Sequence, residues 1–594
     1  MDNFIIAAGG TGAMCAQAFI YLAAAGCANN LDTYHILLMD KDRQSDAVTD
    51  CENLLADYKA MQKQMGLKPG TTTFPTVKVH KWNFTDEIVD EYVQRTGMPA
   101  ANLATLTLNK LLNPKMDGKI GQVLSTMYTQ EELNTDLEKG FYGHPNIGAP
   151  VFDYVRERFL SEHVTYSDGT VRDNTFMVDL HNVLNKGIAH VYLMGSLFGG
   201  TGATVIPNVV LALRGLKDAA DNPVGRTNLV LGGSVIMPYF KLPAREHDSV
   251  EKLSPVAPTD VKFAGQARDA LSYYNESGLL NEMMNLLLLG SSKLDVTSEL
   301  YARGGVQSQH FHVVLLMAAV AANRFFADQL GHMAGCDTAP VAPKGELLVW
   351  KAAPDNGGIY NTLTVGELGL VNEYEKLVKF LRFSVVVGYY MRLRFENTPE
   401  EMKDWAEIVG TWQQMKDENG NPLGKITNHQ ITSYYKIPVQ KAGAICRGFI
   451  KFFYDVALSG YDWSGYHEKE KQSEQTVDGM QYYRYSVTDT VQKTAAANFV
   501  ERWVDLANLA DLKDLLETTK PSDIANRKTL NEICSYNLLD DGRPAVVEAN
   551  YPNHIAGVYE DTMKSLGLTR NLFGAIKRKD VWFCEIYEEI LRRV

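Results

Sequence analysis

The sequence contains no C-x-x-C motif, and its cysteines are few and scattered. There are seven of them in 594 residues, at positions 15, 27, 51, 336, 446, 534 and 584. An odd number without paired spacing argues against a disulfide framework and against a zinc ribbon. We therefore expect a protein of a reducing compartment, the cytoplasm.

Long hydrophobic runs are also missing. The longest apolar run covers residues 313–322, and a membrane-spanning helix requires roughly 18 such residues. The apolar residues 4–8 lead directly into glycines, a pattern typical of a strand and not of a signal-peptide core. The sequence thus predicts neither a membrane span nor secretion.

Basic charge is in short supply. The chain has 58 lysines and arginines against 71 acidic residues, which gives a net charge of −13. This balance disfavours general binding to nucleic acid or to anionic lipid. With only 21 prolines and 45% hydrophobic residues, the composition excludes collagenous and disordered classes. At about 150 residues per domain, the length predicts two to four packed domains.

Short apolar runs alternate with amphipathic stretches through the first 340 residues. Strands are predicted over residues 4–8, 35–39, 76–82, 188–196, 228–237 and 286–289, and helices over 13–25, 50–64, 151–160, 204–213, 267–284 and 311–330. This alternation is typical of an α/β fold in which helices cover a mostly parallel sheet. Residues 341–594 are expected to form a second, α+β and helical portion, with a strand over 347–350 and helices over 371–394 and 581–593.

One short motif occurs twice. Gly-Gly-Thr-Gly-Ala fills positions 9–13 and again positions 199–203, each time between a predicted strand and a predicted helix. Glycines at such a turn let the backbone pass close to a phosphate, and the helix N-terminus offers free N–H groups to the anion. Two such turns would hold one polyphosphate. The alternative for either copy is a turn that serves only tight packing.

Two common nucleotide-binding motifs do not fit these turns. A dinucleotide-binding Rossmann turn needs G-x-G-x-x-G, whereas Gly10 and Gly12 are followed at the third place by Cys15. Neither copy continues into the Gly-Lys-Ser/Thr of a P-loop. A Rossmann-type oxidoreductase is therefore the least favoured of the hypotheses considered.

The repeat and its flanking elements resemble the tubulin and FtsZ superfamily, in particular the broad bacterial group of tubulin-like proteins. The superfamily signature is a G-G-T-G-[ST/A]-G loop after the fourth strand, joined by a glycine loop after the first strand; here Thr204 replaces the final signature glycine. The resemblance covers roughly residues 1–335 and implies a tubulin-like nucleotide-binding domain that binds GTP or GDP with Mg²⁺. The residues it assigns to the nucleotide are Gly9, Gly10, Thr11, Gly12, Ala13, Asp40, Asp42, Gly143, Gly199, Gly200, Thr201, Gly202 and Ala203.

Three segments carry particular roles in this resemblance. Asp40 takes the place that holds phosphate-bound magnesium or ribose, and residues 140–148 resemble the loop that faces the terminal phosphate. Residues 304–312 resemble the loop that reaches the nucleotide of a neighbouring subunit. Its expected catalytic residues are Gln307, Gln309 and His310. The loop has no Asp or Glu to polarise water, but glutamine orients water in small GTPases, so slow hydrolysis is expected. The alternative is that these side chains, with that of His312 in the same loop, cap the following helix and face solvent.

The resemblance implies a homo-oligomer that assembles head to tail into a filament, with slow GTP hydrolysis at the subunit interface. Several bacterial tubulin-like proteins are encoded with conflict or defence systems, so such a role, with an operon-encoded protein partner, is a further expectation. A nucleotide-sensing scaffold that does not hydrolyse its ligand is the alternative from a different functional class.

Three weaker signals complete the sequence analysis. Tyr273 or Asn275 is expected to contact the nucleotide base. The pair Tyr482 and Tyr483 is more typical of packed core or interface than of a site. The spacing His310-x-His312 offers two nitrogen donors without a clear third ligand, so no metal site is predicted.

Overall fold

A computed structural model of the chain describes residues 1–40, 45–65, 74–98, 105–112, 122–123, 126–137, 141, 145–241, 260–290, 295–296, 311–327, 346–351, 371–391, 437–459, 471–477, 480–485, 536–538, 544–546, 555–569 and 583–594. The chain divides into two compact units. The first comprises Met1–Phe19, Leu31–Glu52 and Val77–Ala353, and the second comprises Ile20–Asn30, Asn53–Thr76 and Pro354–Val594. The expected division after residue 340 stays a prediction.

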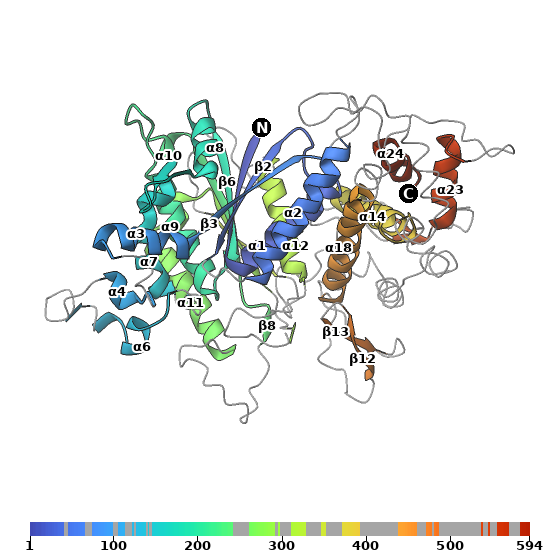
Figure 1. Cartoon of the computed structure of the whole chain (residues 1–594). Helices are drawn as coiled ribbons and strands as arrows, with labels where there is room; N and C mark the ends of the chain where they lie inside the picture. Colours follow the sequence, from blue (N-terminus) through green and yellow to red (C-terminus); the bar gives the residue numbers. More distant parts are fainter. Residues whose placement is uncertain are drawn as a thin grey trace. The chain divides into compact units, whose positions relative to one another are not determined.

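The first unit is built on a sheet of seven strands (Figure 1). In spatial order they are β11 (Glu346–Lys351), β9 (Asn285–Gly290), β7 (Leu229–Ile236), β6 (Ala189–Ser196), β1 (Asp2–Ala8), β2 (Thr33–Asp40) and β3 (Thr76–Asn83). From β11 across to β2, each neighbouring pair is parallel. The α/β fold with a parallel sheet is thus confirmed. The strand expected over residues 76–82 is β3, which lies at one edge of the sheet.

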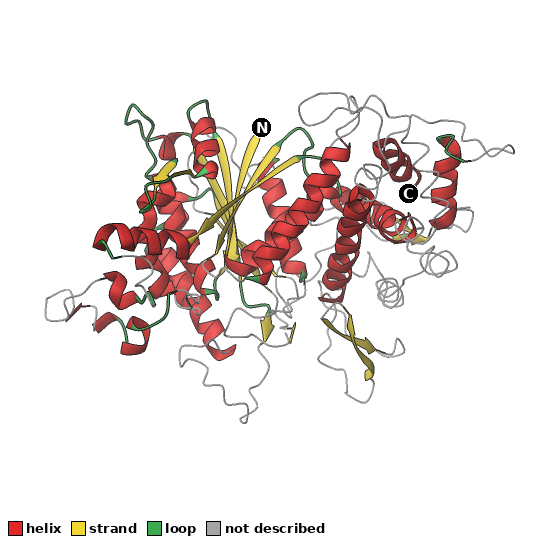
Figure 2. Ribbon diagram, viewed as in Figure 1, coloured by secondary structure: helices red, strands yellow, loops and turns green. Residues whose placement is uncertain are grey.

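Helices cover both faces of this sheet (Figure 2). On one face lie α1 (Gly9–Ala24) and α12 (Val313–Phe326), where Phe19 packs against Tyr34 and Phe326. On the other face lie α8 (Thr175–Leu184) and α9 (Gly200–Arg214), where Phe176 meets Phe4 edge to face. Outside α9 pack α7 (Pro145–Leu160) and then α3 (Phe84–Thr96). Residues on both faces of the central strands are fully buried, which explains their continuous apolar sequences.

Several boundaries differ from the sequence prediction in an instructive way. Gly9 already belongs to α1 and Gly200 to α9, so the glycine motifs form the first helical turns and not separate loops. Residues 145–148, expected in a loop, form the first turn of α7, because proline is well suited to the first position of a helix. The helix expected over 267–284 is α11 (Asp260–Glu276), followed by the short 3₁₀ helix Leu279–Glu282.

Smaller elements complete the first unit. They are α2 (Asp46–Met65), which belongs to the other unit from Asn53 onward, α4 (Leu108–Leu112), α6 (Gln130–Leu133), α10 (Val224–Thr227), the hairpin of β4 (His163–Thr165) and β5 (Val171–Asp173), and the parallel pair of β8 (Phe240–Lys241) and β10 (Asp295–Val296).

In its described residues the second unit has helices and two short hairpins. The expected α+β and helical character of residues 341–594 stays a prediction, and the strand expected over 347–350 is β11 in the sheet of the first unit. The helices of the second unit are α14 (Val371–Ser384), continued by a π-helical segment Val385–Met391, then α18 (Ile437–Ser459), α23 (Ile555–Ser565) and α24 (Phe583–Arg593). Phe380 packs against Phe449, and Phe383 against Tyr587. The hairpins are β12 (Lys471–Val477) with β13 (Met480–Tyr485), which carries Tyr482 and Tyr483, and β14 (Tyr536–Leu538) with β15 (Pro544–Val546).

Two findings concern the described residues of both units. Among the described helices, none has the length and apolarity needed to cross a bilayer. Four cysteines lie in the described part of the chain, at positions 15, 27, 51 and 446, and all four are free thiols.

Candidate functional site

The two glycine motifs lie side by side at the carboxyl edge of the sheet. The first follows β1 and the second follows β6, and these strands are direct parallel neighbours. The chain leaves β1 through α1 toward β2 on one side, and leaves β6 through α9 toward β7 on the other. The order of strands therefore reverses between β1 and β6. Open α/β sheets bind their ligands at such a switch point, outside the carboxyl ends of the strands.

The two motifs are in direct contact. A Cβ atom placed on Gly9 would lie 3.3 Å from Cβ of Thr201 and 3.4 Å from the backbone nitrogen of Gly202. Gly9 has a φ of +71°, a left-handed conformation that favours glycine. Thr201 in turn donates a hydrogen bond to Asp40, with Oγ1 3.4 Å from Oδ1. The structure thus joins three sequence-predicted site residues from three separate parts of the chain.

The last glycine of each motif has a packing role. A Cβ atom on Gly12 would lie 2.7 Å from the carbonyl oxygen of Met194 and 2.8 Å from the carbonyl carbon of Ala7. A Cβ atom on Gly202 would lie 2.7 Å from both the backbone nitrogen and oxygen of Ser196. These glycines allow α1 and α9 to lie against the strands that precede them. Tight packing, the alternative raised for each motif, is therefore confirmed at these two positions.

The remaining residues of the motifs form the first turns of two helices. Gly199 is the N-cap of α9, and no side chain caps that helix. Neither α1 nor α9 has an acidic residue in its first turn. Helix N-termini carry partial positive charge and free N–H groups, so two neighbouring first turns without an acidic residue are favourable for an anion. Asp40 brings a carboxylate beside them, which suits a cation bound together with that anion.

Three other elements approach the same turns. Gly10 lies near the beginning of α2, since its Cβ position is 3.9 Å from both Cβ of Ala47 and Oγ of Ser45. Gly148 in the first turn of α7 packs directly against Thr204, with no room for a Cβ. The α11 residue Tyr274 donates a hydrogen bond of 3.1 Å to the carbonyl oxygen of Ala203, and burial raises the pKa of Tyr274 above its usual range.

Thr204 stands where the superfamily signature has its final glycine, and the structure shows what its side chain does. The hydroxyl is buried and donates a 2.7 Å hydrogen bond to the carbonyl oxygen of Gly200, one turn earlier in α9. The buried Thr204 hydroxyl therefore stabilises the first turn of α9.

Five further predicted site residues lie outside the described residues, and their roles stay predictions: Asp42, Gly143, Gln307, Gln309 and His310. His312 is described: it is buried and accepts a hydrogen bond from the backbone nitrogen of Val314 through Nδ1, as the N-cap of α12. The capping half of the alternative is thus confirmed for His312, and its solvent-facing half is wrong, because the side chain is buried.

The residues expected at the base lie on α11, where Tyr273 and Asn275 are both exposed. Their contact with a base stays a prediction.

Sequence reasoning missed Ser196, which shapes the second turn. Ser196 is the last residue of β6, and its Oγ accepts a hydrogen bond of 3.2 Å from the backbone nitrogen of Gly199. A single serine that ends an otherwise apolar strand, three residues before a glycine pair, is the signal that points to this role.

No protein-family model, curated protein or solved structure matches this chain. A functional proposal therefore depends on the chemistry of the site.

Proposed function

We propose that this chain is a nucleotide-binding protein that holds the phosphates of GTP or GDP, with Mg²⁺, at the paired glycine turns. One observation carries the proposal: two identical Gly-Gly-Thr-Gly-Ala motifs touch each other at the switch point of a parallel sheet. Packing accounts for Gly12 and Gly202, the positive φ accounts for Gly9, and a Cβ on Gly199 would lie 2.6 Å from Oγ of Ser196, but Gly10 has only ordinary contacts at 3.9 Å. A phosphate ligand would explain a glycine at position 10, because it requires close backbone approach and free helix N–H groups.

Each part of the site has its own proposed role. The first turns of α1 and α9 bind phosphate oxygens through backbone N–H groups. Asp40 and Thr201 hold the magnesium ion, which neutralises phosphate charge when bound. The guanine base, the tubulin-like assembly into head-to-tail filaments and the slow hydrolysis through Gln307, Gln309 and His310 are the parts of the proposal that follow from the resemblance alone.

Replacing Gly10 by valine tests the phosphate site. The new side chain fits the protein, since its Cβ has only ordinary contacts at 3.9 Å, but it crowds the first turn of α1. Losing two charge-assisted hydrogen bonds at about 1.5 kcal/mol each lowers affinity for GTP roughly a hundredfold. Isothermal titration calorimetry of the folded variant measures the change.

The matched control for this test is Gly187→Val. Gly187 is exposed just before β6, at the opposite edge of the sheet, and has no atom within 4 Å of its Cβ position. It should bind GTP as the wild type does. Equal GTP affinity in folded Gly10→Val and wild-type protein would show that the phosphates lie elsewhere. NADH in the same titration serves as the test of the oxidoreductase hypothesis, and we expect no binding.

Replacing Asp40 by asparagine tests the magnesium role. The amide keeps the shape of the side chain but removes the charge that attracts Mg²⁺. We expect Mg²⁺ to raise the GTP affinity of the wild type, and this enhancement to fall at least about tenfold in the variant, since one charged interaction is worth about 1.5 kcal/mol. Affinity measured with EDTA should change little. Asp153→Asn, an exposed carboxylate on α7, is the control.

A further inference from the structure

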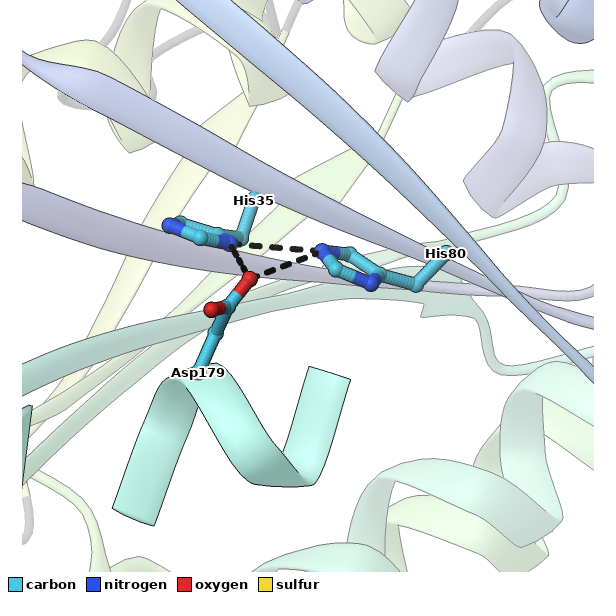
Figure 3. A group of neighbouring side chains, drawn as sticks. All are labelled: His35, His80 and Asp179. Carbon is cyan, nitrogen blue, oxygen red and sulfur yellow. Dashed lines mark hydrogen bonds and ion pairs between the residues drawn. The ribbon is translucent and has the colours of Figure 1, made fainter. Parts of the chain in front are cut away.

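A second cluster of polar side chains lies at the other end of the sheet, on the face covered by α8. Three atoms converge there: Nδ1 of His35 in β2, Nε2 of His80 in β3 and Oδ2 of Asp179 in α8 (Figure 3). Nδ1 of His35 is 3.2 Å from Nε2 of His80 and 3.1 Å from Oδ2 of Asp179, and the last two atoms are 3.9 Å apart. His35 and His80 are buried, and the Asp179 side chain is 29% exposed.

One contact of this triangle has no proton when both rings are neutral. Nε2 of His35 is 3.0 Å from Oδ1 of Asp2, and an ionised carboxylate only accepts hydrogen bonds, so the ring proton of His35 lies on Nε2. Nδ1 of His35 then presents a lone pair to both His80 and Asp179. A proton on Nε2 of His80 serves the first contact and Lys78 donates to Oδ2 of Asp179, but the 3.1 Å contact between Nδ1 of His35 and Oδ2 of Asp179 joins two acceptors. A cation at the centre of the three atoms would accept all three lone pairs at once.

We propose that His35, His80 and Asp179 bind a divalent transition-metal ion of the zinc class. Two imidazole nitrogens and one carboxylate oxygen are a ligand set that zinc takes in proteins. Bonds of about 2.0–2.1 Å in tetrahedral geometry place ligand atoms roughly 3.3–3.4 Å apart. The three observed distances of 3.1, 3.2 and 3.9 Å lie on either side of that value. Three protein ligands leave a fourth position for water.

The surroundings of the ligands have the form of a metal site. Each histidine directs its second nitrogen to a polar partner: His35 to Asp2, and His80 to Oγ1 of Thr175 at 2.7 Å. Such partners orient metal-binding imidazoles and set which nitrogen is free. Phe4 stacks on His35, and Phe176 meets the ring of His80 edge to face, so the rings are held in apolar packing.

One charged neighbour competes with the metal. Nζ of Lys78 lies 3.3 Å from Oδ2 of Asp179. The lysine side chain is 47% exposed, so its flexible stem can move the ammonium group into solvent when a cation takes its place. Lys78→Met is therefore expected to bind metal at least as tightly as the wild type does.

Metal binding to the full, untagged chain tests the proposal. Protein treated with chelator is titrated with Zn²⁺ by calorimetry and with Co²⁺ by visible absorption. The wild type should bind one tight equivalent and show the intense spectrum of tetrahedral Co²⁺. Asp179→Asn and His80→Gln should lose this equivalent. Asp2→Asn, which keeps all three ligands, should weaken it by about 10- to 100-fold. Zn²⁺ should also raise the melting temperature of the wild type but not of Asp179→Asn.

The control variant is His163→Gln. His163 pairs with Asp173 at 2.8 Å in an exposed hairpin, and no third ligand joins this pair among the described residues. The His163→Gln variant should therefore leave the tight equivalent unchanged. Circular dichroism checks that each variant is folded, and Asp2→Asn remains informative if a ligand variant does not fold. A wild type without a tight equivalent, or a folded Asp179→Asn that binds as the wild type does, would overturn the proposal in favour of a proton shared among the three side chains.

Discussion

Replacing Arg158 by methionine should lower the free energy of unfolding by about 3–5 kcal/mol, because it removes the counter-charge of the buried Glu87 and Asp90, while Glu91 keeps its ion pair with Arg95. Arg158 on α7 donates to Glu87 at 2.8 Å, to Asp90 at 2.9 Å and to Glu91 at 3.3 Å, all on α3. The arginine side chain is 8% exposed, and those of the three acids are 9–16% exposed. Urea denaturation of wild type and variant measures the difference.

A second arginine on the same helix provides the comparison for this experiment. Arg156 also pairs with acids, Asp153 and Glu157, but its side chain is 47% exposed. Exposed ion pairs contribute about 0–1 kcal/mol, so Arg156→Met should change stability by no more than that. If both variants lose the same amount, charge pairing across α3 and α7 is not what stabilises this part of the fold.

The sheet could be predicted from the sequence because its strands are marked locally. Parallel strands covered on both faces are continuous apolar runs, and residues 188–196 and 228–237 have this form. The order of the strands could not be predicted in the same way. Whether β6 pairs with β1 depends on contacts between residues about 190 positions apart, which no local pattern encodes.

The candidate site shows the same limit. The repeated Gly-Gly-Thr-Gly-Ala motif indicated both turns. The contact of Gly9 with Thr201 and the hydrogen bond of Thr201 to Asp40 could not be predicted, because they join residues far apart in the sequence. The sequence alone also could not show which glycines are needed for packing, since that depends on how closely each helix approaches a strand.

The histidine cluster was missed for a related reason. In the sequence, His35 and His80 each lie within a predicted strand, and a buried histidine usually has a hydrogen-bond partner nearby. Only the pairing of β2 and β3 within one sheet, and the position of Asp179 on α8, bring the three side chains together.

Replacing Gly12 by valine should cost about 3 kcal/mol or more, since overpacking a well-packed interior typically costs about 1–3 kcal/mol and here the obstacle is backbone. The Cβ atom would overlap the carbonyl groups of Ala7 and Met194, which belong to the neighbouring strands β1 and β6 and cannot move separately. The variant should therefore melt well below the wild type or fail to fold.

Gly10→Val, two residues earlier in the same helix, is the comparison. The Cβ position of Gly10 has no contact shorter than 3.9 Å, so this variant should melt near the wild type while losing affinity for GTP. Differential scanning calorimetry of the pair separates the two roles within one motif. If Gly12→Val instead melts normally, α1 has room to move away from the sheet, and the third glycine of the motif would have to be explained by the ligand.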